Sequence, residues 1–426
     1  MSSSQSLSGP RLGEFVTLAA LMTSLVALSI DAMLPALADI GADLEVAHDN
    51  DRQLVVAMLF LGLAIGQVIY GPLSDSFGRK RPIYAGFVIF IAGCLLSAFA
   101  TDYTTMLVGR LLQGLGAAGP RIVVIAMVRD LYEGRAMARI MSIVMAVFIL
   151  VPALAPAMGQ GILVLSHWRV IFGLLFVLAV VALTWFALRQ PETLQAERRR
   201  PFTWQTVYGA IHECCASRVA MGYTVAGGLV FGAFVGYLTS SQQIFQELYG
   251  LGHLFPLYFG VLALAIGAAG LFNAKLVMRY GMRPLSRVAL IILTILTGAF
   301  AAYVLLSAPT APFWLFMGVM IVGFFCIGIL FGNFNALAMA PLGHIAGVAA
   351  AVVGSGTTFI SFAVGTAIGA LYDGTVLPLV VGFAGLGLLA LLAMAWAESG
   401  RPEAEAEDEG ADDVADKDGD DTVPSN

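Results

Sequence analysis

Twelve long apolar runs dominate the sequence of this 426-residue chain. A helix needs about 20 apolar residues to cross the roughly 30 Å hydrocarbon layer of a membrane. Because unpaired backbone polar groups are costly in lipid, such a run crosses the membrane as a helix. The sequence therefore predicts an all-α membrane protein with twelve transmembrane helices. The runs cover residues 14–37, 53–72, 82–100, 104–127, 138–163, 168–188, 217–243, 255–277, 285–306, 312–337, 346–370 and 377–397.

The basic residues fall mainly on one side of this predicted membrane protein. Only 12% of the residues are charged, about half the share of a soluble domain. Most Lys and Arg residues lie at alternate junctions between runs, on the side of Arg11, whereas the opposite junctions carry Arg52 and Arg169. Since positive residues mark the cytoplasmic side, both termini are expected there. The first run is long and lacks a small-residue cleavage site, so we interpret it as a retained span.

A basic linker at residues 189–216 divides the runs into six plus six. Laying the second group over the first places Gly281 on Gly78 and Leu276 on Leu73, which indicates an internal repeat. Two such halves are typical of one class of membrane transport protein, with the substrate site between the halves. The predicted domains are a cytoplasmic N-terminus at 1–13, six-helix bundles at 14–188 and 217–397, and a disordered, acidic cytoplasmic tail at 398–426.

The loop between the second and third runs concentrates charge in an otherwise apolar region. Gly78 permits a tight turn there, and Asp75 offers a carboxylate to a helix N-terminus or to nearby bases. The stretch from Gly71 through Asp75, Gly78 and Arg79 to Arg81 closely resembles the loop signature of the major facilitator superfamily.

This resemblance implies the major facilitator fold and a set of contacts for the loop. It implies that Asp75 caps the eleventh span near Gly347 and that Arg79 pairs with Asp130 at the end of the fourth. Together these contacts would form a cytoplasmic latch between the halves. The alternative is that the bases only set the topology of the chain.

Three further stretches resemble the drug/proton antiporters of that superfamily, in particular Bcr/CflA-type multidrug exporters. They are Arg110–Ala118 in the fourth span, Val151–Gly161 in the fifth and Ser29–Leu37 in the first. Pro152, Pro156 and Gly159 belong to the antiporter motif of the fifth span, where they would bend or thin the helix. Ordinary kinks are the alternative. Gln160 and Arg121 depart from the family pattern.

The fourth span also contains a pattern that satisfies the dinucleotide-binding fingerprint, from Gly114 to Gly119. That fingerprint requires a preceding strand, whereas here it lies inside an apolar run. Small residues in such a run allow close helix packing. We therefore expect no nucleotide and no other cofactor, with a proton gradient as the energy source.

Ionisable residues inside a span are costly and indicate a functional site. With a rise of 1.5 Å per residue, Asp31 lies about 10 Å and Arg110 about 9 Å from the outer ends of their spans. The first and fourth spans are neighbours in the resembled family. We therefore predict that Asp31 and Arg110 face each other across a cavity and couple proton movement to transport. A static buried ion pair that fixes helix register is the alternative.

Several weaker candidates would line the substrate cavity. Arg121 follows Arg110 on the same helix and either faces substrate or pairs with Asp130 at the interface. The remaining candidates are amides, for which packing between helices is the alternative. They are Gln113, Asn333 and Asn335.

Together these features predict proton-coupled export of small amphipathic compounds across a bacterial inner membrane by alternating access. The expected partners are the lipid bilayer, protons and these substrates, with no nucleic acid, no metal and a monomeric chain. A dedicated transporter of one metabolite and a transport-inactive sensor with the same fold remain as alternatives. The five His residues are scattered, which argues against an enzyme.

Overall fold

The computed structural model describes residues 12–132, 134–199, 204–307 and 311–399, in which every regular element is a helix. The chain up to the linker contributes long helices and short turns. These are α1 (Leu12–Asp31), η1 (Leu34–Ala36), α2 (Leu37–Asp43), η2 (Asp49–Gln53), α3 (Leu54–Phe77), α4 (Lys80–Ala98), α5 (Tyr103–Leu131), α6 (Gly134–Leu165) and α7 (Arg169–Arg189).

The linker and the second half contribute the remaining elements. These are η3 (Ala196–Arg198), α8 (Trp204–Ala216), α9 (Arg218–Gln242), η4 (Gln243–Leu248), η5 (Gly252–Leu254), α10 (Phe255–Tyr280), α11 (Met282–Ser307), α12 (Phe313–Met339), η6 (Ala340–Ile345), α13 (Ala346–Ala370) and α14 (Leu377–Glu398).

A long helix occupies the position of each predicted span. By length and hydropathy, ten stretches in the described ranges can cross a membrane. One of them, Phe313–Ala370, contains both α12 and α13, and the apolar part of α6 at Leu150–Leu165 is a further, shorter one. The chain is therefore a multi-pass membrane protein, as the apolar runs predict.

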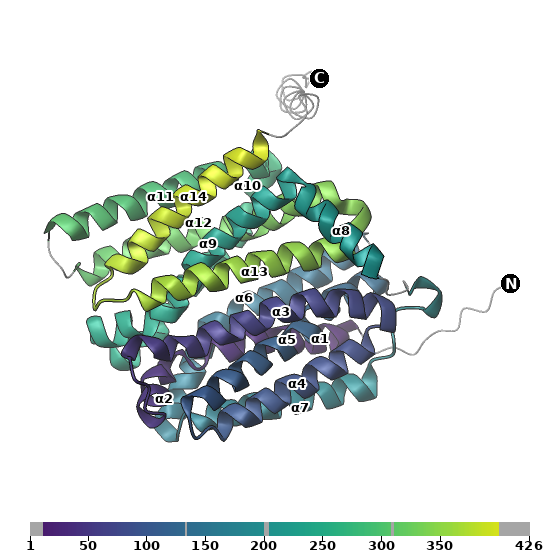
Figure 1. The fold of residues 1–426 in the computed structure, drawn as a ribbon, viewed down its shortest axis with the longest axis horizontal. Coiled ribbons are helices and arrows are strands. Elements are labelled where there is room, and N and C mark those ends of the chain that lie inside the picture. Colours follow the sequence, from purple (N-terminus) through teal and green to yellow (C-terminus); the bar gives the residue numbers. More distant parts are fainter. Residues whose placement is uncertain (1–11, 133, 200–203, 308–310, 400–426) are drawn as a thin grey trace, which may run out of the picture.

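The helices run side by side in two groups, α1 to α7 and α9 to α14 (Figure 1). The groups touch where α3 packs against α13 and where α6 packs against α10. One end of the molecule carries the α3–α4 loop and the linker, and we call it the basic end. The other carries η2, η4 and the turn after α13, and we call it the distal end.

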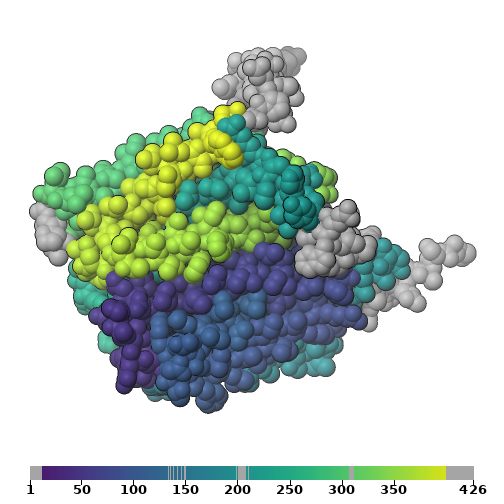
Figure 2. Space-filling view, viewed as in Figure 1, coloured from purple at the N-terminus to yellow at the C-terminus, as the bar shows by residue number. Residues whose placement is uncertain are grey.

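Helix α3 and helix α13 form a close antiparallel seam between the groups, which lie against each other in Figure 2. A Cβ on Gly71 of α3 would lie 3.1 Å from the Cβ of Ala351 on α13. One turn before Gly71 in α3, the Gln67 amide nitrogen donates to the Thr358 hydroxyl of α13 at 3.0 Å. Small residues thus bring the two backbones together, and a polar contact fixes their register.

Glycines of the fourth span also lie in close helix contacts. A Cβ on Gly114 would come 2.0 Å from the Leu59 carbonyl of α3, and one on Gly116 would come 2.3 Å from the Phe90 nitrogen of α4. The glycine pattern that satisfies the dinucleotide fingerprint therefore serves packing within a helix bundle.

Two boundaries differ from the prediction. The first helix ends at Asp31 rather than at residue 37, and the chain continues through η1 into α2. Pro35, near the start of η1, has no backbone N–H to continue the α-helical pattern. The linker, predicted as a loop, contains the helix α8, which packs on α13. The N-terminus and nearly all of the acidic tail, from residue 400 on, lie outside the described residues.

Candidate functional site

The loop between α3 and α4 is built around one buried guanidinium. Gly78 ends α3 with φ +89°, a conformation that favours glycine. This turn directs Arg79 back into the bundle, where its Nε and Nη2 donate to the two carboxylate oxygens of Asp130 at 2.7 and 3.1 Å. Its Nη1 donates to Asp75 at 2.7 Å. The loop thus ties the end of α3 to the end of α5.

Asp75 also lies on the boundary between the two groups of helices. A Cβ on Gly347, at the start of α13, would come 3.0 Å from the second carboxylate oxygen of Asp75. A carboxylate at a helix N-terminus is stabilised by the helix dipole. Asp75 therefore contacts Arg79 on one side and the first turn of α13 on the other.

Glu192 is a member of this loop cluster that sequence reasoning missed. Its carboxylate accepts hydrogen bonds from the backbone N–H groups of Arg79 at 2.8 Å and Lys80 at 3.2 Å, which begin α4. The available signal was an acid three residues past the end of α7, directly after Pro191. Sequence alone does not show that the linker folds back onto this helix terminus.

The electrostatics of the loop keep Arg79 charged. Burial by itself would lower the pKa of Arg79, but hydrogen bonds and charges from Asp130 and Asp75 raise it above its ordinary value. An arginine bound by two carboxylates is also geometrically well matched, since its planar fork meets a carboxylate with two parallel bonds. The cluster is therefore a charged junction throughout the physiological pH range.

Arg110 lies at the centre of the first group of helices and is fully buried. Its Nη2 donates to the Ser29 carbonyl of α1 and its Nε to the Val55 carbonyl of α3, both at 2.8 Å. Nη1 donates to the side chain of Gln113 on its own helix. Arg110 thus reaches the first span at the depth that the sequence predicts, two residues before Asp31, but it binds backbone carbonyls there.

Asp31 is buried at the last residue of α1. Among the described residues no ion pair joins it to Arg110, whose hydrogen bonds go to the carbonyls of Ser29 and Val55 in this state. Helix α9, in the second group, packs against η1, the turn that follows Asp31. Asp31 therefore lies beside the contact between the end of the first span and the first helix of the second half.

The antiporter motif of α6 fixes the end of α1 from the other side. A Cβ on Gly159 would lie 1.7 Å from the Ala32 carbonyl oxygen, so the two backbones are in direct contact. Nearly two turns earlier in α6, the carbonyl oxygen of Ala153 would lie 3.1 Å from a Cβ placed on Gly260 of α10. Pro156 lies between these contacts and Pro152 directly before them, inside a helix that continues from Gly134 to Leu165. Helix α6 thus connects Asp31's surroundings with the second half.

The predicted cavity-lining amides divide into buried and exposed residues. Gln113 donates to the Gly93 carbonyl and the Ser97 hydroxyl of α4, each at 3.2 Å, and is fully buried. Asn333 exchanges hydrogen bonds with Asn273 of α10. Both amides therefore serve helix packing in this state, which was the alternative. Asn335 is exposed on α12, and Arg121 is partly buried on α5.

Polar contacts also join the halves at the distal end. The Asn50 amide nitrogen donates to the Tyr372 carbonyl at 2.8 Å, and the Gln243 amide donates to the Asn50 oxygen at 3.0 Å. Asn50 belongs to η2, whereas both partners belong to the second half. Neighbouring Gln53 is buried against Gly369 of α13, where it leaves no room for a Cβ. These contacts close the distal end of the seam.

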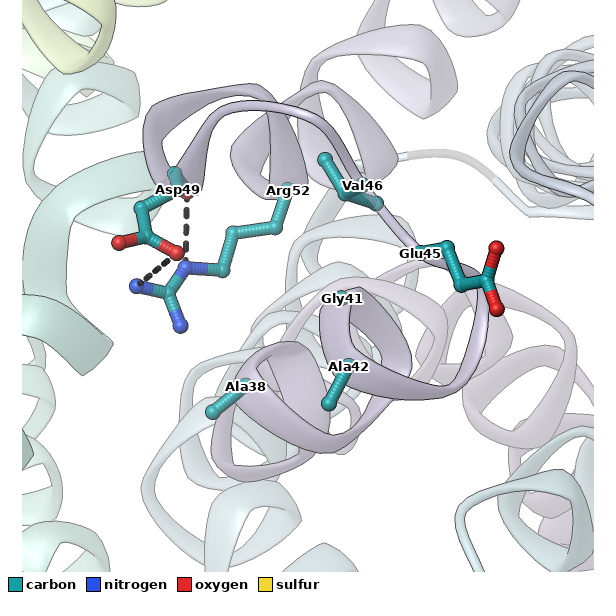
Figure 3. A pocket seen from close by; sticks show the side chains of 7 residues that line it. All are labelled: Ala38, Gly41, Ala42, Glu45, Val46, Asp49 and Arg52. Atoms are coloured by element: carbon teal, nitrogen blue, oxygen red, sulfur yellow. Dashed lines mark hydrogen bonds and ion pairs between the residues drawn. The ribbon is translucent and has the colours of Figure 1, made fainter.

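A cavity of about 290 Å³ lies beside these contacts, between α2 and η2 (Figure 3). Asp49 and Arg52 point toward each other at one edge, and Glu45 points away from them. Arg52 also pairs with Glu247 of the second half at 3.0 Å. This cavity contains neither Asp31 nor Arg110, so it is distinct from the predicted coupling site.

The fold and its buried charges define a multi-pass membrane protein with two helical halves joined by polar contacts at both ends. The model of the Major Facilitator Superfamily matches residues 19–370. The chain therefore belongs to this superfamily of membrane transporters.

Individual relatives agree with this assignment. The uncharacterized MFS-type transporter YdgK of Bacillus subtilis is 30% identical over 77% of this chain and 81% of its own length. The bicyclomycin resistance protein homolog of Haemophilus influenzae is 26% identical over 84% of this chain and 88% of its own. The xylose transporter XylE from E. coli, solved in a partially occluded inward-open conformation, shares the fold at 14% identity with a TM-score of 0.69, covering 90% and 96% of the two chains.

Proposed function

We propose that this protein exports small amphipathic compounds across a bacterial inner membrane in exchange for protons. The observation that carries this proposal is the buried carboxyl of Asp31 at the end of α1, beside the contact between η1 and α9. An acid in this position changes charge at the boundary between two halves that must separate for transport. The name of the Haemophilus relative, a bicyclomycin resistance protein homolog, supports drug export.

The proposed mechanism is alternating access. In the state described here the distal contacts of Asn50 join the halves, as does the close approach of Asp75 to Gly347 at the basic end. Export requires each set to break in turn while the other holds. Arg110 stays in place through its carbonyl partners, and in another state of the cycle Asp31 turns toward it. A proton entering under a membrane potential of 100 mV supplies about 2.3 kcal/mol.

The test is dye transport in inverted membrane vesicles with an imposed pH gradient. We expect uptake of an amphipathic dye that collapses when a protonophore removes the gradient. Asp31→Asn should abolish gradient-driven uptake while the protein remains inserted at wild-type level. Undiminished uptake by this variant would refute the role of Asp31. A transporter dedicated to one metabolite would transport none of the dyes in a panel, but addition of its metabolite would still cause proton movement across the vesicle membrane.

We further propose that both termini lie in the cytoplasm, because the basic end carries Arg79, Lys80 and Arg81. A reporter enzyme that is active only in the periplasm, fused after residue 426, should be inactive. The same reporter fused within the distal turn between α13 and α14 should be active.

A further inference from the structure

Two buried polar groups from opposite halves lie at matching positions in their helices. Asp31 is nineteen residues after Leu12, where α1 begins, and Tyr237 is nineteen residues after Arg218, where α9 begins. Both helices begin at the basic end, so both groups lie about 28 Å along their helices. The first helices of the two repeats therefore present a carboxyl and a phenol at the same height.

The Tyr237 hydroxyl has no hydrogen-bond partner among the described residues, although the side chain is fully buried. Leaving a buried hydroxyl unpaired is unfavourable, and such groups in native proteins call for an explanation. Aromatic rings surround Tyr237, including Phe324 at 4.7 Å and Phe259 at 5.6 Å between ring centroids. The ring is thus held in place, and its hydroxyl is available to one partner that moves.

Asp31 is the group that meets this requirement. It is buried at the end of α1, at the same height as Tyr237, and α9 packs on η1, the turn that follows it. We propose that Tyr237 is the positioning residue of the second half that holds Asp31, its hydroxyl donating to the carboxylate of Asp31 once that carboxylate is ionised. This inference rests on the proposed function, in which Asp31 carries the proton.

The pairing gives the proton a mechanical effect. A hydrogen bond to an ionised acceptor is roughly twice as strong as one between neutral groups. Ionised Asp31 therefore holds the end of α1 to α9, and protonation weakens that hold. When the protein carries no proton on Asp31, the hydrogen bond keeps the two halves together there. The distal end then opens less often without a proton bound.

Among the residues that the structure describes, few other charged or titratable groups lie on the helices packed against α1. Helix α1 packs against α5, α6 and α7. Arg110 of α5 is engaged with carbonyls of Ser29 and Val55, and Arg169 of α7 pairs with Asp43 at the distal end. Arg189 of α7 pairs with Glu14 at the basic end, and the arginines of α6 lie in its first turns at that end. Tyr237 and Arg110 are thus the groups placed to respond to Asp31.

The experiment compares Tyr237→Phe with Tyr223→Phe, which removes a hydroxyl from the same helix where its partner is Glu398. Tyr237→Phe removes a hydrogen-bond donor from the ionised carboxylate of Asp31, so Asp31 should bind its proton more tightly. In vesicles, the pH of half-maximal dye transport should therefore rise by about one unit, a tenfold change in proton affinity. Tyr223→Phe should leave this midpoint unchanged. In an Asp31→Asn background, Tyr237→Phe should have no further effect.

A second measurement separates this inference from the proposed function. The thermal stability of the purified protein in detergent, at pH 5 and pH 8, requires no transport. Tyr237→Phe should lower stability more at pH 8, where Asp31 is more ionised, and Asp31→Asn should remove this difference. An equal effect at both pH values, or an unshifted transport midpoint in active vesicles, would overturn the pairing. Absence of proton-driven transport in wild-type vesicles would instead refute the proposed function alone.

Discussion

Gly159 of α6 and Ala32 at the end of α1 are in direct backbone contact, so close that a Cβ on Gly159 would lie 1.7 Å from the Ala32 carbonyl oxygen. Because Ala32 follows Asp31, this contact sets where the buried carboxyl lies. It also explains in physical terms why the fifth-span motif requires a glycine at this position.

Gly159→Ala should therefore displace α6 from α1 and impair transport. Overpacking of this kind typically costs about 1–3 kcal/mol. Gly161→Ala on the same helix is the matched control, since a Cβ there meets nothing within 4 Å. Thermal unfolding in detergent and dye transport would both be measured. Equal behaviour of the two variants would show that the contact is unimportant.

Arg79→Lys should weaken the basic-end cluster, because lysine cannot make the two parallel bonds to Asp130. Breaking a buried ion pair costs about 3–5 kcal/mol, so we expect lower thermal stability and strongly reduced transport. Arg81→Ala, which removes an exposed charge from the same loop, should have little effect.

The pH dependence of this cluster follows from the direction of the shift. Because Asp130 and Asp75 raise the pKa of Arg79, its stabilising contribution is present at pH 7 and at pH 9, which both lie below its ordinary value. It is lost only as the pH rises through the higher folded value. Thermal unfolding of the wild type and of Arg79→Lys should therefore differ by the same amount at pH 7 and pH 9. A difference that shrinks at pH 9 would contradict this.

Gly78→Ala and Gly281→Ala should separate backbone strain from steric conflict. Both glycines have positive φ, +89° and +75°, so either substitution costs of the order of 1–3 kcal/mol. Only at Gly78 would the new Cβ also meet the Glu192 carboxylate, at 2.6 Å. Gly78→Ala should consequently lower the melting temperature more. The reverse order would mean that Glu192 does not hold the start of α4.

Asn50→Ala should loosen the distal end, because Asn50 bonds to both Tyr372 and Gln243. Each lost hydrogen bond is worth about 1 kcal/mol, so the loss of both should make opening roughly thirtyfold more frequent. A membrane-impermeant maleimide added to intact cells would report this through Ser241→Cys, a buried position near η4. Glu45→Gln, which changes an exposed side chain, should leave the labelling rate unchanged.

Arg121 is the remaining candidate for substrate contact. If its charge faces the transport path, Arg121→Ala should reduce transport of anionic dyes several-fold and leave cationic dyes unaffected or improved, as expected from local charge complementarity. Parallel measurement of one anionic and one cationic dye checks this. An equal loss for both dyes would indicate a structural role.

The sequence by itself determined the number and positions of the membrane helices, because lipid forces each apolar run to satisfy its backbone internally. It also indicated the turn at Gly78 and the buried acid Asp31. The family resemblance supplied Asp130 as the partner of Arg79 and Gly347 as the neighbour of Asp75. All of these are properties of short segments or of motifs read along the chain.

Only the tertiary structure decided which groups meet. It placed Arg110 on the carbonyls of Ser29 and Val55, added Glu192 to the loop cluster, and packed α9 against η1, the turn after α1. The physical reason is that helices in lipid are apolar on their outer faces as well as their inner ones. Periodicity along such a helix does not reveal its rotation, and that rotation depends on the close contacts of glycines such as Gly114 and Gly159 with neighbouring helices.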